Sequence, residues 1–360
     1  MYEGRSTMYI LGPCAAESRE QVLTTAEQIC SQLSAFRSQK SDFRFIYRAG
    51  AWKPRTSPNT FQGVGAEALK WLKEVKERFS LPIATEVATP EHVEAAIQAG
   101  VDYLWIGART SANPIAVEKL SESIRNYRNN PNHPNHLKGI LIKNPVNADA
   151  NLWLGNIERL ERTGVSVIAV HRGCNHQPCW HMAHEVRLAR PDIPMLLDPS
   201  HMSGDAAKVQ ELMGKVSELG LDGAMIEVHN NPECALSDSK QQIRPDEIGE
   251  ILEVQLTNIQ RISNLSLTVD PTKDGYTLAW LRAEIDELDE RLWDTIAARM
   301  EVSERIGEWK KAHGVAPLQP ERFNAILEKR KQWAAQKGLP EEFVEQLFEI
   351  IHEQSLREQI

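Results

Sequence analysis

The chain has few cysteines, no long apolar run and no excess of positive charge. It contains five cysteines among 360 residues, and no apolar stretch approaches the roughly 18 residues of a membrane span. The first ten residues lack the apolar segment of a secretory leader. We therefore expect reduced thiols, a cytoplasmic location and no membrane contact. The net charge of −9 argues against a nucleic-acid partner, which would require a basic surface.

A dinucleotide-binding turn is also absent. Gly-x-Gly-x-x-Gly does not follow the first apolar run, which argues against an open doubly wound sheet, the alternative α/β architecture. The sequence instead repeats one unit: a short apolar run, a polar loop and an amphipathic stretch. Eight such units in about 250 residues are typical of a (β/α)8 barrel. The runs are Met8–Leu11, Phe43–Tyr47, Pro82–Ala84, Tyr103–Ile106, Gly139–Ile142, Val165–Val170, Pro194–Leu197 and Gly223–Ile226.

Each apolar run is followed by a residue that can take part in chemistry. In a barrel the carboxyl ends of the strands share one face, where the active site lies. One set of these residues is cationic: Arg48, Lys53, Arg55, Arg109, Lys143 and Arg172. Converging cations repel one another unless an anion neutralises them. The set therefore predicts a substrate that carries phosphate and carboxylate groups.

A second set of strand-end residues can bind a metal ion: Cys14, His201, Glu227 and Asp238. One thiolate, one imidazole and two carboxylates can hold a divalent first-row metal and leave a position open for substrate. Another group has the spacing of a zinc knuckle: Cys174, His176, Cys179 and His181. Because this group lies in one short run, we interpret it as a polar loop, with structural zinc as the less favoured alternative.

The motifs of the first 260 residues resemble those of 3-deoxy-D-arabino-heptulosonate 7-phosphate (DAHP) synthases of the short, barrel-only type I. They are Gly12-Pro-Cys-x-x-Glu-Ser18, Lys53-Pro-Arg-Thr-Ser-Pro58, Gly107-Ala-Arg109, Asp198-Pro-Ser-His201 and Glu227-Val-His229 with Ala235-Leu-Ser-Asp238. The resemblance implies condensation of phosphoenolpyruvate with erythrose 4-phosphate in the shikimate pathway of aromatic biosynthesis. It also implies one divalent ion, with Mn²⁺ favoured, held by Cys14, His201, Glu227 and Asp238.

The same resemblance implies substrate contacts. Phosphoenolpyruvate would be bound by Arg48, Lys53, Arg109, Lys143 and Arg172, and erythrose 4-phosphate by Arg55 and Thr56. Lys53 would lie between the two anions as a proton donor, and Glu86 is expected to act on the attacking water. The alternative for the barrel is 3-deoxy-D-manno-octulosonate 8-phosphate synthase, which uses arabinose 5-phosphate. Pro54 stands where that family has Ala-Asn, which favours the four-carbon aldose. After Lys143 the chain has Asn144-Pro145 in place of Arg-Gly or similar.

From Tyr276 onward the pattern is helical. We interpret residues 262–275 as a linker between a barrel over 1–261 and an all-α domain over 276–360. Three helices are expected, at Tyr276–Ala312, Pro320–Lys337 and Pro340–Gln359. An apolar seam of seven-residue period runs along the first helix and is interrupted by Arg299. The seam and its flanks comprise Leu278, Leu281, Ile285, Leu288, Leu292, Val302 and Ile306.

This segment resembles the all-helical chorismate mutase domain, which rearranges chorismate to prephenate. The resemblance rests on Leu281-Arg-x-x-Ile-Asp-x-x-Asp289, Arg299, Lys310, Arg322, Ser355 and Gln359. It implies that the arginines bind two carboxylates and that Lys310 and Gln359 bond the ether oxygen. Gln319 and Phe323 replace an aspartate and a glutamate that are common there, so recognition of the hydroxyl group is expected to differ.

The position of Arg282 predicts a homodimer. Along a straight helix Arg282 lies about 42 Å from Lys310, so it can share a site with Lys310 only if it comes from an antiparallel second chain. The alternative is a helical domain that dimerises or senses a ligand without turnover. Because we identify no separate regulatory domain, we also expect the mutase domain to sense chorismate or prephenate and to restrain the barrel.

Overall fold

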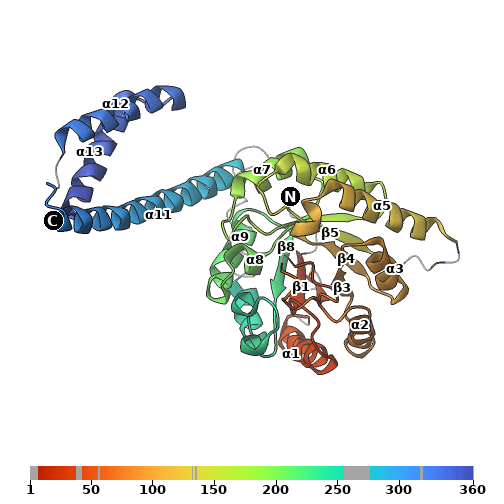
Figure 1. Ribbon diagram of the computed structural model, residues 1–360. Helices are drawn as coiled ribbons and strands as arrows, with labels where there is room; N and C mark the ends of the chain where they lie inside the picture. The colour runs from red at the N-terminus through yellow and green to blue at the C-terminus, as the bar shows by residue number, and fades with distance from the viewer. Residues whose placement is uncertain are drawn as a thin grey trace, which may run out of the picture. The chain divides into compact units, whose positions relative to one another are not determined.

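The computed structural model describes residues 7–37, 43–55, 57–131, 133, 136–254, 276–316 and 319–359. In this part of the chain eight parallel strands close into a barrel in chain order, and β1 pairs with both β2 and β8. Figure 1 shows the strands at the centre of a ring of helices. The strands are β1 (Thr7–Gly12), β2 (Phe43–Arg48), β3 (Ile83–Glu86), β4 (Tyr103–Ile106), β5 (Gly139–Lys143), β6 (Val167–His171), β7 (Met195–Leu197) and β8 (Gly223–Glu227). The predicted barrel is confirmed.

Helices connect successive strands on the outside of the barrel. They are α1 (Arg19–Arg37), α2 (Glu67–Phe79), α3 (Pro90–Gln98), α5 (Pro114–Asn129), α6 (Ala150–Glu161), α7 (Trp180–Ala189) and α9 (Val209–Glu218), with a further helix over 248–254. Two short helices directly follow strands: α4 (Ala108–Ser111) and α8 (Pro199–Ser203). Single 3-10 turns are η1 (Ala206–Lys208), η2 (Pro232–Cys234), η3 (Ser239–Gln241) and η4 (Pro245–Glu247). Proline at the first turn and a capping side chain start α3 and α5, as the N-caps Thr89 and Asn113 show.

The core has two layers, one inside the barrel and one between the strands and the helices. Ile10, Trp105 and Leu141 are among the side chains that fill the barrel interior. Neighbouring strand residues, such as Leu11 and Leu104, point outward and pack under the helices. Both faces of each strand are therefore covered, which explains why the strands appear in the sequence as continuous apolar runs.

The chain divides into two compact units, Met1–Glu284 and Ile285–Ile360. The long helix α11 (Tyr276–Ala312) begins in the first unit and continues in the second, which also contains α12 (Pro320–Lys337) and α13 (Glu341–Arg357). The expected linker, 262–275, lies outside the described residues. No helix in the described ranges is both long and apolar enough to cross a membrane.

Candidate active sites

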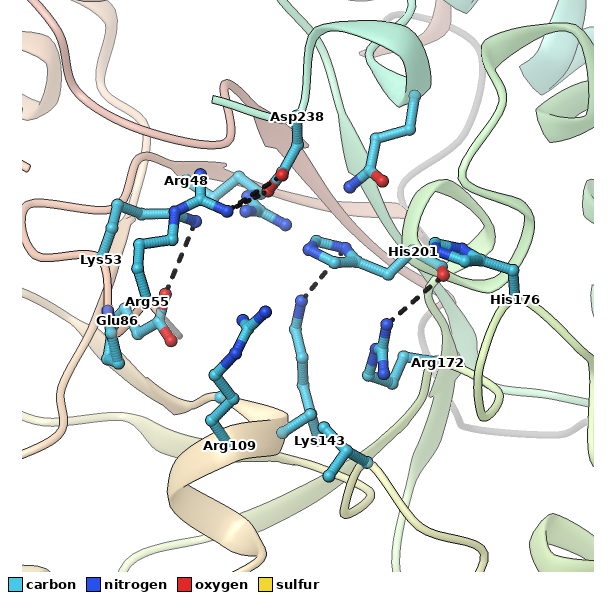
Figure 2. Close-up of a pocket in the computed structure, with 15 residues that line it drawn as sticks. Arg48, Lys53, Arg55, Glu86, Arg109, Lys143, Arg172, His176, His201 and Asp238 are labelled. Carbon is cyan, nitrogen blue, oxygen red and sulfur yellow. Dashed lines mark hydrogen bonds and ion pairs between the residues drawn. The ribbon is translucent and has the colours of Figure 1, made fainter. Parts of the chain in front are cut away.

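A cavity of about 200 Å³ lies among the residues that follow the strands. All six predicted cations line it: Arg48, Lys53, Arg55, Arg109, Lys143 and Arg172. Figure 2 shows these side chains around one space, together with Glu86, His176, His201 and Asp238. The strand ends therefore bring together cations that are spread over more than a hundred residues of sequence.

The position of each cation follows from the barrel. Arg48 and Lys143 are the last residues of β2 and β5, and Arg172 comes directly after β6. At Gly12, which has φ +146°, a β-carbon would lie 2.1 Å from the carbonyl oxygen of Arg48. At Gly107 a β-carbon would lie 2.1 Å from Oε1 of Glu86. Gly12 is required because the backbone of Arg48 approaches it too closely for any side chain, whereas a side chain at position 107 would have to displace the carboxylate of Glu86.

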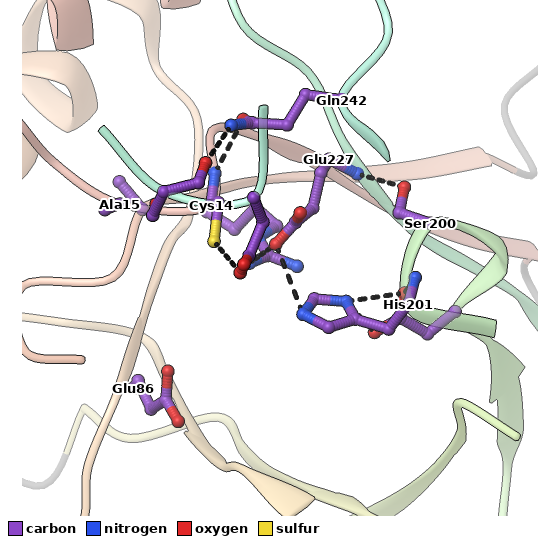
Figure 3. A network of polar contacts seen from close by, with 12 residues as sticks. Cys14, Ala15, Glu86, Ser200, His201, Glu227 and Gln242 are labelled. Carbon is purple, nitrogen blue, oxygen red and sulfur yellow. Dashed lines mark hydrogen bonds and ion pairs between the residues drawn. The ribbon is translucent and has the colours of Figure 1, made fainter. Parts of the chain in front are cut away.

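Two of the predicted metal donors, His201 and Asp238, line this cavity, and the other two lie directly beside them. One ligand atom each from Cys14, Glu227 and Asp238 lies within 4.8 Å of the other two. Among the described residues, these three form the group of potential ligands that are close enough together to hold a metal ion. The fourth predicted donor is adjacent, with His201 Nε2 3.5 Å from Glu227 Oε1 (Figure 3). A thiol, an imidazole and two carboxylates at one point fit a divalent first-row metal.

Buried charges around the donors are paired. Arg48 Nη2 lies 2.9 Å from Glu227 Oε1, and its guanidinium stacks 4.7 Å from the ring centroid of Trp105. Arg48 Nε and Nη1 and Arg172 Nε are buried without a hydrogen-bond partner in the described part of the chain. Buried donors without partners are costly, so these nitrogens are suited to bind the oxygens of an anionic ligand.

Lys53 occupies the centre of the charge network. Its Nζ lies 3.0 Å from Cys14 Sγ and 3.7 Å from Glu86 Oε2. Burial alone would lower the pKa of Lys53, but the charges of Cys14 and Glu86 raise it above its usual value. Lys143 behaves differently: burial lowers the pKa of this side chain, and Asp198, 2.6 Å away, offsets only part of that effect.

Two buried side chains that support the site were not among the predicted site residues. Asp198 Oδ1 lies 3.0 Å from Nδ1 of His201 and caps α8 by accepting from the backbone N–H of His201. A carboxylate at Nδ1 fixes the ring and directs Nε2 outward, as in metal-binding histidines. Gln241 Nε2 donates to Glu227 Oε2 at 2.7 Å. The strand-end position of Asp198 was a signal for its role, whereas the sequence around Gln241 carried none.

The loop after β6 does not bring its four potential zinc ligands to one point. Its four potential ligands do not form a group close enough to hold an ion, although all of them are described. Cys174 is buried and accepts a contact from Asn144 Nδ2 at 3.7 Å, while His176 lines the barrel cavity. Thr56, predicted to bind the aldose phosphate, lies outside the described residues.

A second cluster lies between α11 and α13. Arg299 Nη1 donates to Ser355 Oγ and, at 3.3 Å, to the carbonyl of Ile351. Lys310 Nζ donates to Gln359 Oε1 at 2.8 Å. Burial lowers the pKa of Arg299, and the nearby Arg330 lowers it further. Four predicted mutase residues therefore form two adjacent polar pairs. Arg322 is exposed on α12, and Arg282 belongs to the other compact unit.

The fold and these two clusters define a (β/α)8-barrel enzyme with an appended helical domain. Comparisons with known proteins identify both parts. Residues 2–262 match the DAHP synthetase I family, and residues 281–360 match chorismate mutase type II. The chain belongs to the DAHP synthetase I family and carries a C-terminal chorismate mutase type II domain. It is accordingly a bifunctional enzyme of the shikimate pathway, as the motifs predicted.

Known relatives agree with this assignment. The phospho-2-dehydro-3-deoxyheptonate aldolase of Thermotoga maritima is 28% identical over 251 residues, which cover 68% of this chain and 67% of that protein. A crystal structure of this DAHP synthase has a TM-score of 0.59 at 25% identity and covers 71% of this chain and 70% of that one. A 2-dehydro-3-deoxyphosphooctonate aldolase of Trichlorobacter lovleyi is 27% identical over 266 residues, 69% of this chain and 91% of that protein.

Proposed function

We propose that the barrel joins phosphoenolpyruvate to erythrose 4-phosphate in a metal-dependent reaction, and that the helical domain converts chorismate to prephenate. The observation that carries the first proposal is a cavity lined by six cations and by His201 and Asp238, with the other two potential metal ligands beside them. An anionic substrate neutralises the cations, and a metal ion neutralises the thiol and the carboxylates.

We assign the metal to Cys14, His201, Glu227 and Asp238. A divalent ion at these residues, for which we favour Mn²⁺, would act as a Lewis acid towards the aldehyde oxygen of the aldose. The softness of the thiol and imidazole favours a first-row transition metal over Mg²⁺.

The remaining residues bind the substrates and move protons. Arg48, Arg109, Lys143 and Arg172 hold the phosphate and carboxylate of phosphoenolpyruvate, and Arg55 with Thr56 holds the aldose phosphate. A carbon–carbon bond forms between C3 of phosphoenolpyruvate and the aldehyde carbon, and Lys53 donates a proton to the former aldehyde oxygen. Water adds at C2 as Glu86 accepts its proton. The C2–O bond to phosphate then breaks with its electron pair while the C2 hydroxyl gives its proton to the departing phosphate, leaving the ketone and inorganic phosphate. Glu86 returns the proton that it accepted to Lys53, which lies 3.7 Å away.

One purified sample, offered both aldose phosphates, tests the assignment of the barrel. We expect release of phosphate from phosphoenolpyruvate to be fastest with erythrose 4-phosphate, because Pro54 stiffens and shortens the central loop. The named alternative uses arabinose 5-phosphate, in line with the phosphooctonate aldolases among the relatives. Faster turnover with arabinose 5-phosphate would replace our proposal with that activity.

For the helical domain we propose a site completed by a second chain. Chorismate would be held by residues of one chain, which are Arg299, Lys310, Arg322, Ser355 and Gln359, together with Arg282 of an antiparallel partner. Large apolar side chains along α11 support an interface, since Ile285, Leu288 and Leu292 are 57%, 58% and 45% exposed. Light scattering should give the mass of at least a dimer. Leu288→Glu should lower both this mass and the loss of chorismate absorbance, and Arg299→Ala should lower the absorbance change alone.

We further propose that chorismate or prephenate bound to the helical domain inhibits the barrel. Ligands that prefer one state of a protein shift its equilibrium by their differential affinity. Synthase rates of the full chain with and without prephenate measure the effect, and Arg299→Ala should abolish it. Equal rates with and without either ligand would remove the proposal.

A further inference from the structure

The first turns of α11 pack against α7 within the barrel's compact unit. Trp280 is fully buried, and its ring lies 5.5 Å from that of His184 and 6.1 Å from that of Trp180. Glu284 Oε1 lies 2.9 Å from His184 Nδ1. A tryptophan from beyond residue 262, where the match to the synthase family ends, therefore belongs to the packing of the barrel.

These contacts continue to the end of β6. Trp180, the first residue of α7, lies 5.4 Å from the ring of His171, the last residue of β6. His171 is fully buried, and its Nε2 donates to the carbonyl of Pro178 at 2.7 Å. The two aromatic residues thus enclose the loop 172–179, which begins with Arg172 at the cavity (Figure 2).

This loop has a strained backbone. Three of its residues that are not glycine have left-handed φ angles: Asn175 at 52°, His176 at 60° and Cys179 at 50°. Residues with a side chain are strained in this conformation and persist in it only where the surrounding structure holds them. The loop therefore depends on external support, and Trp180 at its carboxyl end is held by Trp280.

We propose that Trp280 is a positioning residue of the synthase: by packing on Trp180 it keeps the loop 172–179 closed and Arg172 directed at phosphoenolpyruvate. The proposal rests on the assignment of Arg172 to that substrate. It predicts that Trp280, a residue of the appended segment, sets the affinity of the barrel for phosphoenolpyruvate. The affinity for erythrose 4-phosphate should not change, because Arg55, on the loop after β2, is held independently by Asp238 at 3.0 Å.

Kinetics of full-length variants test the proposal. Trp280→Leu removes the aromatic support, and we expect about a tenfold increase in KM for phosphoenolpyruvate with KM for erythrose 4-phosphate and kcat within about twofold of wild type. Trp280→Phe retains a smaller ring and should give an intermediate KM. The matched control is Trp71→Leu on α2, a half-buried tryptophan packed against the same core, which should leave both KM values unchanged.

The outcomes separate positioning from simple stability. An unchanged KM for phosphoenolpyruvate in both Trp280 variants would overturn the proposal. The proposal would also be overturned if Trp280→Leu changed the KM values for phosphoenolpyruvate and erythrose 4-phosphate equally and Trp71→Leu gave the same changes. If Trp280→Leu does not fold, Trp280→Phe against wild type decides in the same way. Arg172→Lys distinguishes a failure of the underlying assignment: if it leaves KM for phosphoenolpyruvate unchanged, the role of Arg172 is wrong, whatever the Trp280 variants show.

Discussion

The side-chain oxygen of Asn144 accepts a hydrogen bond from the backbone N–H of Arg172 at 2.7 Å, and its amide donates to the carbonyl of Gly173 at 3.0 Å. Asn144 is fully buried and follows β5 directly. It therefore ties the end of β5 to the loop after β6, and so fixes the backbone that carries Arg172.

Replacing this asparagine should reduce both stability and substrate affinity. Asn144→Ala leaves one buried N–H and one buried carbonyl with a lost partner, which should lower the free energy of unfolding by about 2 to 3 kcal/mol. KM for phosphoenolpyruvate should rise as well. Denaturant titration and steady-state kinetics measure the two effects. Asn144→Asp retains the acceptor for the N–H of Arg172 but loses the donor to Gly173, so its free energy of unfolding should lie between those of wild type and Asn144→Ala. An alanine variant as stable as wild type would contradict this role of Asn144.

Metal removal should divide the two activities. The four proposed metal ligands belong to the barrel, whereas the proposed mutase residues Arg299, Lys310 and Gln359 would stabilise charge on the ether oxygen without an ion. A chelator should abolish DAHP formation and leave chorismate turnover intact, and Mn²⁺ should restore the first activity. Asp238→Asn should raise the Mn²⁺ concentration for half-maximal rate at least about tenfold. The control is Asp246→Asn, which should leave this Mn²⁺ concentration unchanged, because the side chain of Asp246 is 75% exposed. Parallel loss of both activities would count against the assigned ligands.

Gly307 should be essential to the helical site. A β-carbon there would lie 2.6 Å from the α-carbon of Gln359, so Gly307→Ala must displace the end of α13. We expect chorismate turnover to fall by about tenfold or more, because Gln359 would lose its contact with Lys310. Synthase activity provides the internal reference. Gly214→Ala in α9, where nothing lies within 4 Å of the added carbon, should be neutral or slightly stabilising.

His171 should make barrel stability fall in acid. Burial lowers the pKa of His171 from 6.5 to about 3, with the charge of Arg172 and His181 acting in the same direction and Asp198 opposing it. Below pH 6.5 the unfolded chain binds a proton that the folded chain excludes, so stability present above this pH is lost by about 1.4 kcal/mol per pH unit down to about pH 3. Urea titrations between about pH 7.5 and pH 5 measure the slope. His171→Gln should reduce the dependence of the free energy of unfolding on pH. His313→Gln, at an exposed position, should leave it unchanged.

The fold could be predicted because its physical causes are local. A strand covered on both faces must be apolar throughout, so β1 and β6 appear as short runs, and proline with a capping residue marks the start of α3. Parallel closure then places every strand end on one face, which was sufficient to group Lys143 with Arg48. These inferences need no knowledge of contacts between particular side chains.

The finer parts of the site could not be predicted, because they depend on such contacts. The hydrogen bond between Asn144 and Arg172 spans 28 residues, and nothing near Asn144 indicates it. The helices α4 and α8 have four and five residues, too few to show helical periodicity. Likewise, the burial of Trp280 depends on a surface formed by α7, so its sequence neighbours identified only a helix.

The contact between Cys14 and Asp238 joins residues 224 positions apart. During synthesis on the ribosome the thiol is made early, but the last of the proposed companion donors emerges only when nearly the whole barrel has been translated. If these residues hold the metal as proposed, a nascent chain could not load it before β8 has closed against β1. The geometry of the finished barrel, rather than the affinity of a bare cysteine, would then decide which metal is retained.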